Sequence, residues 1–139
     1  MTYNVGMQRS IFTTYLQELF SIARIKDASM NGLQVEGASD IKKIIGAVDI
    51  NDAVIEYAIA QKADTIIVHH GFFGGKPLAI EGVLRERIKK LLTHNINLYA
   101  VHLPLDMHPV LGNNIVIMNA IGIQDRSEER RVGKECRSR

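Results

Sequence analysis

The feature that most constrains the fold is an alternation of short apolar segments with longer helical patterns. The predicted strands, rich in Ile, Val and Ala, are residues 42–49, 65–69 and 97–102. The predicted helices, with apolar residues recurring at spacings of three and four, are residues 8–25, 51–61, 80–93 and 113–120. Strands that are apolar on both faces favour a parallel sheet covered by helices on both sides. The sequence therefore predicts an α/β fold in the order α-β-α-β-α-β-α.

The periodicity also predicts which helical residues face the core. In the first helix the expected inward stripe is Ile11, Tyr15, Leu19 and Ile22, widened by Phe12 and Leu16, with Ser10 as the N-cap. In the third helix the expected inward residues are Val83, Leu84, Ile88, Leu91 and Leu92. Residues 27–40, rich in Asn, Gly, Ser and Asp, are expected to form a loop with a short extended piece at 33–35.

The last fourteen residues differ in character from the rest of the chain. They hold six of the 17 basic and three of the 15 acidic residues, so residues 1–125 carry 11 basic and 12 acidic side chains. Residues 126–139 show no apolar periodicity and resemble the translation of a sequencing-adapter oligonucleotide. We expect residues 126–139 to be a non-native or disordered tail and exclude them from the predicted fold.

The charge and cysteine content exclude some function classes. A body close to neutrality gives no argument for nucleic-acid binding. The sole cysteine, Cys136, lies in the tail, so the body offers no disulfide and no thiolate ligand. No stretch approaches the roughly 18 apolar residues of a membrane helix, and residues 1–10 lack the apolar core of a signal peptide. We therefore expect a cytoplasmic protein.

Polar residues follow each predicted strand where it ends. The first strand closes at Asp49, the second at His69 and His70, and the third at His102, with Asp106 four residues later. In an open parallel sheet, ligands bind beyond the carboxyl ends of the strands. These side chains are therefore expected to converge at one edge of the sheet.

The two adjacent histidines place a further constraint on the site. Neighbouring strand residues point to opposite faces, so His69 and His70 are expected to reach one crevice only if the chain turns, which Gly71 allows. Gly74 and Gly75 would let backbone approach closely. One imidazole for each metal favours two ions, and an imidazole and carboxylate set suits Zn, Fe, Mn, Co or Ni.

The alternative is that these histidines are structural. A lone histidine at a strand end is more often a hydrogen-bonded interior residue than a ligand, but burying a pair without partners costs free energy. Asp106 by itself would more often be a turn cap. We assign His94 to a helix end and His108 to a loop. Phe72 and Phe73 are expected to pack rather than to form a substrate platform.

Three motifs, "NGLQVEG" at 31–37, "VHHGFFGGKPLAIEGVLRERIKKLL" at 68–92 and "VHLPLDMHPVLGNN" at 101–114, resemble the Nif-three-like dinuclear-metal-centre family. Its members are commonly labelled GTP cyclohydrolase I type 2 homologues. The resemblance covers about the first half of a typical family chain, which implies that residues 1–125 are the N-terminal part of a family domain. It implies a three-layer α/β fold and a homohexamer with dinuclear centres.

The resemblance also implies roles for individual residues. His69 and His70 match the paired histidine ligands, Asp106 matches a bridging carboxylate, and His102 matches a minor ligand or a residue supporting the ligands. The family's remaining His and Glu ligands have no counterpart here, and Gly74 stands where a Trp is frequent. We therefore expect weak or mononuclear metal binding by this chain.

Two classes of function remain open. The first is a metal-dependent hydrolase in which two ions about 3.5–4 Å apart activate a water; Glu36 and Asp49 are weak candidates for a general base. The second is a non-enzymatic metal-binding scaffold, or a ring protein that recruits partners. The substrate and the metal stay open in both readings.

Overall fold

The computed structural model describes residues 6–122 of the 139-residue chain. The predicted tail at 126–139, with its cysteine, lies outside these residues. Contacts divide the chain into two compact units, Met1–Pro104 and Leu105–Arg139, and each is described by itself.

The first unit is built on a four-stranded sheet in the order β2-β6-β5-β4. Its strands are β2 (Gly32–Val35), β4 (Ile44–Asp49), β5 (Thr65–His70) and β6 (Asn97–Ala100). The pairs β4–β5 and β5–β6 are parallel, and β2 lies antiparallel to β6 at the edge. A short ribbon, β1 (Met7–Gln8) with β3 (Asp40–Ile41), accompanies the sheet. The sheet is thus mainly parallel, as the apolar strands predict.

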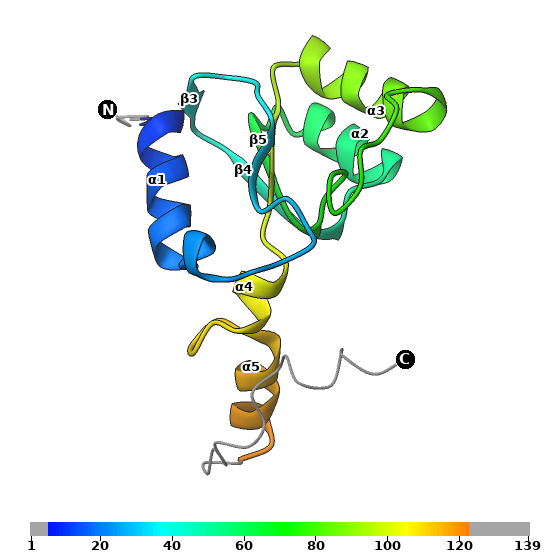
Figure 1. The fold of residues 1–139 in the computed structure, drawn as a ribbon. Coiled ribbons are helices and arrows are strands. Elements are labelled where there is room, and N and C mark those ends of the chain that lie inside the picture. Colours follow the sequence, from blue (N-terminus) through cyan, green and yellow to red (C-terminus); the bar gives the residue numbers. More distant parts are fainter. Residues whose placement is uncertain (1–5, 123–139) are drawn as a thin grey trace, which may run out of the picture. The chain divides into compact units, whose positions relative to one another are not determined.

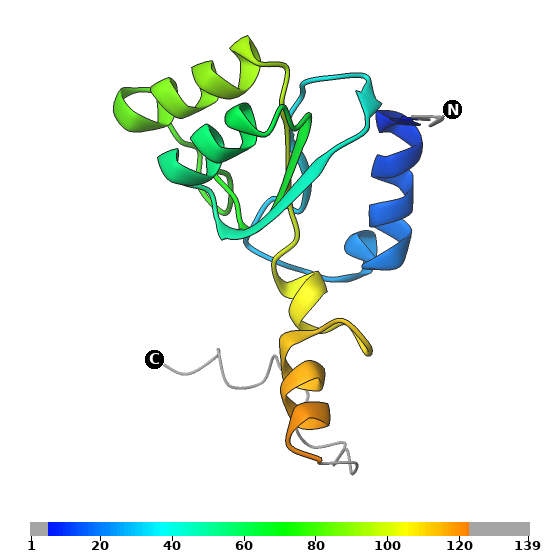
Figure 2. The same ribbon diagram turned by 180° about the vertical axis from the view of Figure 1, so that it is seen from behind.

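Helices cover both faces of the sheet, which makes three layers (Figure 1). On one face lie α2 (Asp52–Ala60) and α3 (Gly82–Thr93), and on the other lies α1 (Arg9–Leu19), followed by the one-turn 3₁₀ helix η1 (Ile22–Arg24). The reverse view in Figure 2 shows the same separation of the helices by the sheet. The predicted α/β class with a mainly parallel sheet is confirmed.

The core has two parts, one on each face of the sheet. The larger part packs Ile55 and Ala58 of α2 and Leu91 of α3 against Ile66 and Leu98 of the central strands. The smaller part packs Phe12 and Leu16 of α1 against Tyr99 and Ile41. The side chain of Asn51 caps α2 by accepting a hydrogen bond from the Val54 amide at 3.0 Å, as the sequence predicts.

The predicted inward face of the first helix is right for Phe12 and Leu16 and wrong for Ile11 and Tyr15. Ile11 and Tyr15 are 57% and 53% exposed, whereas Phe12 and Leu16 are buried. The ring of Phe12 meets Tyr99 edge to face, with the centroids 5.4 Å apart. Two apolar stripes one residue apart compete in this segment, and contact with an aromatic strand residue selects between them. The predicted N-cap is also wrong, because the helix begins after Gln8 and Ser10 lies inside it.

Part of the third helix's predicted face is also wrong. Ile88 and Leu91 are buried, but Val83 and Leu92 are exposed. The helix covers the sheet only along a narrow stripe, so the residues flanking that stripe face solvent.

The end of the chain's described part contains two further helices. The helix α4 (Leu103–Asp106) was not predicted from the sequence, and α5 (Asn113–Ala120) matches the fourth predicted helix. The residues from Leu105 onwards belong to the second compact unit.

Candidate metal centre

Three histidines of the first unit converge at the carboxyl ends of β5 and β6. The ring centroids of His69 and His70 lie 4.4 Å apart, those of His69 and His102 lie 4.8 Å apart, and those of His70 and His102 lie 5.5 Å apart. The expectation that strand ends bring these histidines together is therefore confirmed for all three.

No turn separates His69 from His70, which corrects the prediction made for Gly71. Both residues belong to β5, and yet their rings lie side by side. The reason lies in the neighbouring strand, because β6 ends at Ala100, opposite Val68. The two histidines therefore extend past the last β6 pair, where both rings have room to approach each other.

Each of the three rings places its Nδ1 against an oxygen that can only accept a hydrogen bond. The Nδ1 of His69 lies 3.0 Å from the Val101 carbonyl, and the Nδ1 of His70 lies 2.7 Å from Oδ1 of Asp49. The Nδ1 of His102 lies 3.1 Å from Oδ2 of Asp27. Each Nδ1 is therefore the donor, which puts the lone pair of each neutral ring on Nε2.

This arrangement fits a divalent metal ion. The ligand atoms that the three histidines offer lie within 4.8 Å of one another. In a tetrahedral zinc site, where each imidazole nitrogen lies about 2.0–2.1 Å from the ion, two such nitrogens are about 3.4 Å apart, so the most separated ligand atoms would have to approach by about 1.5 Å. Rings that donate from Nδ1 to a carbonyl or carboxylate are oriented as metal-binding histidines usually are.

Asp27 is the residue of this centre that sequence reasoning missed. Its side chain is only 3% exposed. Burial raises the pKa of Asp27, but hydrogen bonds from Asn31, Ser29, His102 and Leu103 outweigh burial and lower it from 3.8 to about 2. The carboxylate therefore stays ionised and holds the imidazole of His102. The available signal was an acidic residue at the start of the polar segment 27–40. It did not reveal the partner, because 75 residues separate Asp27 from His102.

Two side chains of the predicted "NGLQ" motif fix the surrounding backbone. Asn31 accepts a hydrogen bond from the His102 amide at 2.7 Å through Oδ1, and donates to Asp27 through Nδ2 at 2.9 Å. Gln34 accepts from the Phe72 amide at 2.7 Å and donates to the Phe73 carbonyl at 3.1 Å. A Cβ at Gly71 would collide with the Gln34 side chain, so glycine is needed there for close approach.

Asp106 ends α4 and lies in the second compact unit. Its Oδ1 accepts a hydrogen bond from Nδ2 of Asn113 at 3.1 Å, within that unit. The ring of His108 accepts from the amides of Val110 and Leu111 in a turn between α4 and α5, which agrees with its assignment to a loop. His94 is the C-cap residue of α3, as predicted.

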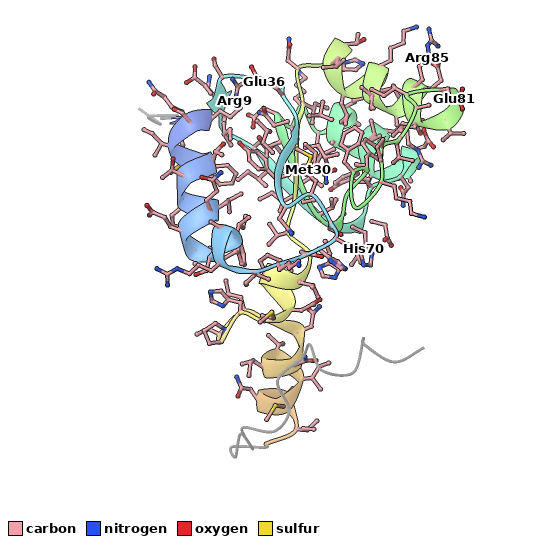
Figure 3. The ribbon with its side chains drawn as sticks, viewed as in Figure 1. Arg9, Met30, Glu36, His70, Glu81 and Arg85 are labelled. Carbon is pink, nitrogen blue, oxygen red and sulfur yellow. The ribbon has the colours of Figure 1, made fainter. Side chains whose placement is uncertain are left out.

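The two carboxylates considered as a general base have different positions. Glu36 pairs with Arg9 at 2.8 Å, at the end of β2. Because β2 runs antiparallel to β6, the carboxyl end of β2 lies at the end of the sheet far from the histidines. The labels of Glu36, Arg9 and His70 in Figure 3 show this separation. Glu36 is therefore wrong as a base for this centre. Asp49 lies at the same end of the sheet as the histidines, but its carboxylate is hydrogen-bonded to His70.

Among residues 6–122, no helix has both the length and the apolar character needed to cross a membrane. A sequence model of the family Duf34/NIF3 (NGG1p interacting factor 3) matches residues 7–135.

Relatives of known sequence carry one common name. The "GTP cyclohydrolase 1 type 2 homolog" of Yersinia pestis is 46% identical over 112 residues, which are 80% of this chain and 45% of that protein. The protein of the same name from Pasteurella multocida is 53% identical over 102 residues, which are 73% of this chain and 41% of that protein. The chain thus spans about half the length of the curated relatives that it matches.

Solved structures share the fold over a similar span. TTHA1606 from Thermus thermophilus superposes with a TM-score of 0.82 at 42% identity, over 86% of this chain and 50% of that one. Protein ybgI, described as of unknown function, superposes with a TM-score of 0.80 at 42% identity, over 84% of this chain and 47% of that one. With a family match that covers most of its length and a matching fold, the chain belongs to the Duf34/NIF3 family.

Proposed function

We propose that this chain binds divalent metal through His69, His70 and His102, with the carboxylate of Asp106 as a further ligand. The observation that supports this most is the convergence of three imidazoles whose ligand atoms lie within 4.8 Å of one another. The ring of His70 is exposed and those of His69 and His102 are partly exposed, so an ion can reach all three from solvent.

The chain's own residues prepare the ligands for binding. The Val101 carbonyl, Asp49 and Asp27 keep the proton on Nδ1 of each ring, so that Nε2 can face the ion without first losing a proton. The ionised Asp27 adds a negative charge behind His102, which makes that imidazole a better electron donor. Binding therefore needs no change of tautomer in these rings.

We further propose that the complete protein is a metal-dependent hydrolase. Divalent ions at such a centre supply Lewis acidity and lower the pKa of a bound water. The relatives' name, GTP cyclohydrolase 1 type 2 homolog, agrees with a hydrolytic reaction. Two ions per complete chain, drawn from Zn, Fe, Mn, Co or Ni, and a cytoplasmic homohexamer are parts of this proposal.

A non-enzymatic metal-binding scaffold is the second candidate. It is favoured by the exposed apolar residues Ile44 and Val48 on β4, which is an edge strand of the sheet. An apolar strand at an open sheet edge suits assembly with another chain or segment. In that reading the metal would stabilise an assembly rather than act on a substrate.

Metal affinity of matched histidine variants tests the proposal. Competition with a chromophoric chelator should show that His69→Ala and His102→Ala each weaken zinc or cobalt binding at least about tenfold. His94→Ala, at the end of α3, should bind like the unmodified chain. We expect no more than one ion for each 139-residue chain. Unchanged affinity in His69→Ala, or equal losses in His94→Ala, would contradict the proposed centre.

Turnover separates the two candidate functions. The metal-loaded protein of full family length, with its His69→Ala variant as control, should be screened against phosphoester, amide and cyclic-nucleotide substrates. Hydrolysis that disappears in the variant supports the hydrolase. Metal binding without any turnover favours the scaffold.

A further inference from the structure

An open pocket of about 320 Å³ lies between two loops of the first unit. The residues that line it are Ala28, Ser29, Met30, Phe73, Gly74, Gly75, Lys76 and Pro77. The pocket is shallow and open to solvent, so a bound molecule would keep part of its surface exposed. Neither the sequence motifs nor the proposed metal centre assigns a role to it.

The two walls of the pocket are held together by hydrogen bonds. The Met30 amide donates to the Phe73 carbonyl at 3.0 Å, and the Gly75 amide donates to the Ala28 carbonyl. Gln34 donates to the carbonyls of both Met30 and Phe73. A Cβ on Gly74 would lie 3.0 Å from the Ala28 oxygen, so glycine permits this close approach. The pocket is therefore formed before any ligand arrives, which lowers the entropy cost of binding.

The chain places this pocket beside the three imidazoles. Ala28 directly follows Asp27, whose carboxylate holds His102. Phe73 lies three residues after His70. Because three residues span at most about 10 Å, both walls begin within that distance of the histidine cluster.

The lining of the pocket defines the chemistry of its ligand. Phe73 packs against the core, as the sequence predicts, and the part of its ring that remains accessible lines the pocket. Together with the polarizable thioether of Met30, it favours contact with a planar apolar group. Lys76 is the cationic residue of the lining, and none of the eight lining residues, all within the described part of the chain, is acidic. A ligand that uses both features has an apolar ring and an anionic group.

We propose that this pocket binds a small aromatic or heterocyclic anion, with its ring against Met30 and Phe73 and its phosphate or carboxylate at Lys76. That the pocket holds the substrate of the metal centre rests on the proposed function. Binding of the anion by the pocket needs no metal. The two proposals can therefore fail separately.

Fluorescence of a naphthalene probe tests the proposal directly, because the chain contains no Trp. In the presence of EDTA, 1-naphthyl phosphate or 1-naphthoate should bind the 139-residue chain saturably, at least about tenfold more tightly than 1-naphthol or inorganic phosphate. The two anions distinguish a phosphate ligand from a carboxylate ligand. Equal affinity for 1-naphthol would overturn the anion part of the proposal.

Matched variants locate the bound probe. Lys76→Met should weaken binding about tenfold, whereas Lys89→Met, on the exposed side of α3, should not. Met30→Glu should weaken it similarly, whereas Met7→Glu should not, although the two methionines are 49% and 45% exposed. Equal effects within either pair would place the probe elsewhere.

The same variants separate this proposal from the metal proposal. His69→Ala should retain the probe and lose metal, and Lys76→Met should retain metal and lose the probe. Loss of the probe in His69→Ala measured in EDTA would contradict a pocket that binds without metal.

Discussion

Both ends of the central sheet carry networks of polar side chains. The two networks differ in whether their side-chain atoms can bind a ligand. One end holds His69, His70 and His102, and the other holds Asn97 and Asp64. The motif 31–37 contributes to both, because β2 runs the length of the sheet between them. Its first residues support the histidines, and its last residues support Asn97.

At the other end the Asn97 side chain forms a closed network, whereas Oδ1 of Asp64 is buried without a hydrogen-bond partner in the described part of the chain. The Asn97 side chain is fully buried; its Oδ1 accepts from the Gly37 amide at 2.8 Å, and its Nδ2 donates to the carbonyls of Ala38 and Asp64 at 2.9 and 3.1 Å. Both polar atoms of the amide are satisfied by the backbone. Such a network fixes the path of the chain and offers nothing to a ligand.

The histidine end is built differently. Each imidazole uses Nδ1 as a donor to a carbonyl or carboxylate, and this places a lone pair on each Nε2. One ligand nitrogen from each ring lies within 4.8 Å of the other two, at a partly exposed end of the sheet. A buried amide whose oxygen and nitrogen both bond to the backbone, such as Asn97, has a structural role. An imidazole that is oriented through Nδ1 alone keeps its second nitrogen for binding an ion.

The largest effect is expected from opening the closed network. Asn97→Leu leaves the Gly37 amide without its partner, whereas the Asp64 carbonyl keeps the backbone amide of residue 97 at 2.8 Å and the Ala38 carbonyl keeps Arg9 at 3.3 Å. The lost hydrogen bonds and the unsatisfied amide should lower the free energy of unfolding by about 2–3 kcal/mol. Urea denaturation measures this loss. The metal affinity of the folded variant should not change, and a loss below about 1 kcal/mol would contradict the closed network.

The next effect is expected at the histidine end. Asp27→Asn removes the charge behind His102 while keeping the size of the side chain, so metal affinity should fall about 10- to 100-fold. Chelator competition at constant pH measures it. Asn97→Leu should change stability without affinity, so a loss of metal affinity distinguishes Asp27→Asn from it. The comparison fails if Asp27→Asn binds metal normally.

Acid should also reveal Asp27. Its folded pKa of about 2 lies below 3.8, so the ionised carboxylate contributes stability that is present above about pH 4 and is lost as the pH falls through 2. The unmodified chain without metal should therefore be about 2 kcal/mol more stable than Asp27→Asn near pH 6. Denaturation at several pH values should show this difference shrinking between about pH 4 and 2. A constant difference would mean that the carboxylate's charge does not contribute.

The smallest effects are expected from exposed carboxylates at the two ends. Glu36→Gln should change stability by less than about 0.5 kcal/mol, because exposed ion pairs contribute little, and should leave metal affinity unchanged. Asp49→Asn, at the histidine end, should weaken metal binding several-fold through His70. A metal effect of Glu36→Gln equal to that of Asp49→Asn would break the distinction between the two ends.

Much of the fold could be predicted from local patterns. The helices and strands follow from apolar periodicity, and the cap at Asn51 follows from its place before a helix. The meeting of His69, His70 and His102 follows from the rule that parallel strands end at one edge.

The rest depends on contacts that a linear pattern does not encode. The choice of Phe12 over Ile11 as the inward residue is made by Tyr99, which lies 87 residues further along the chain. The hydrogen bond between Asp27 and His102 is likewise a tertiary contact, and so is the close approach of the Gln34 side chain to Gly71. Exposed and buried carboxylates look alike in a sequence, so Glu36 could be named as a base while Asp27 was overlooked.

The most direct test of the metal centre is long-range ¹H–¹⁵N NMR of the histidine rings in the ¹⁵N-labelled chain. The hydrogen bonds predict the Nδ1–H tautomer for His69, His70 and His102 without metal, and zinc should shift the Nε2 resonances of these three rings while leaving His94 unchanged. Zinc shifts confined to His94 or His108, or Nε2–H tautomers in the three clustered rings, would contradict the account.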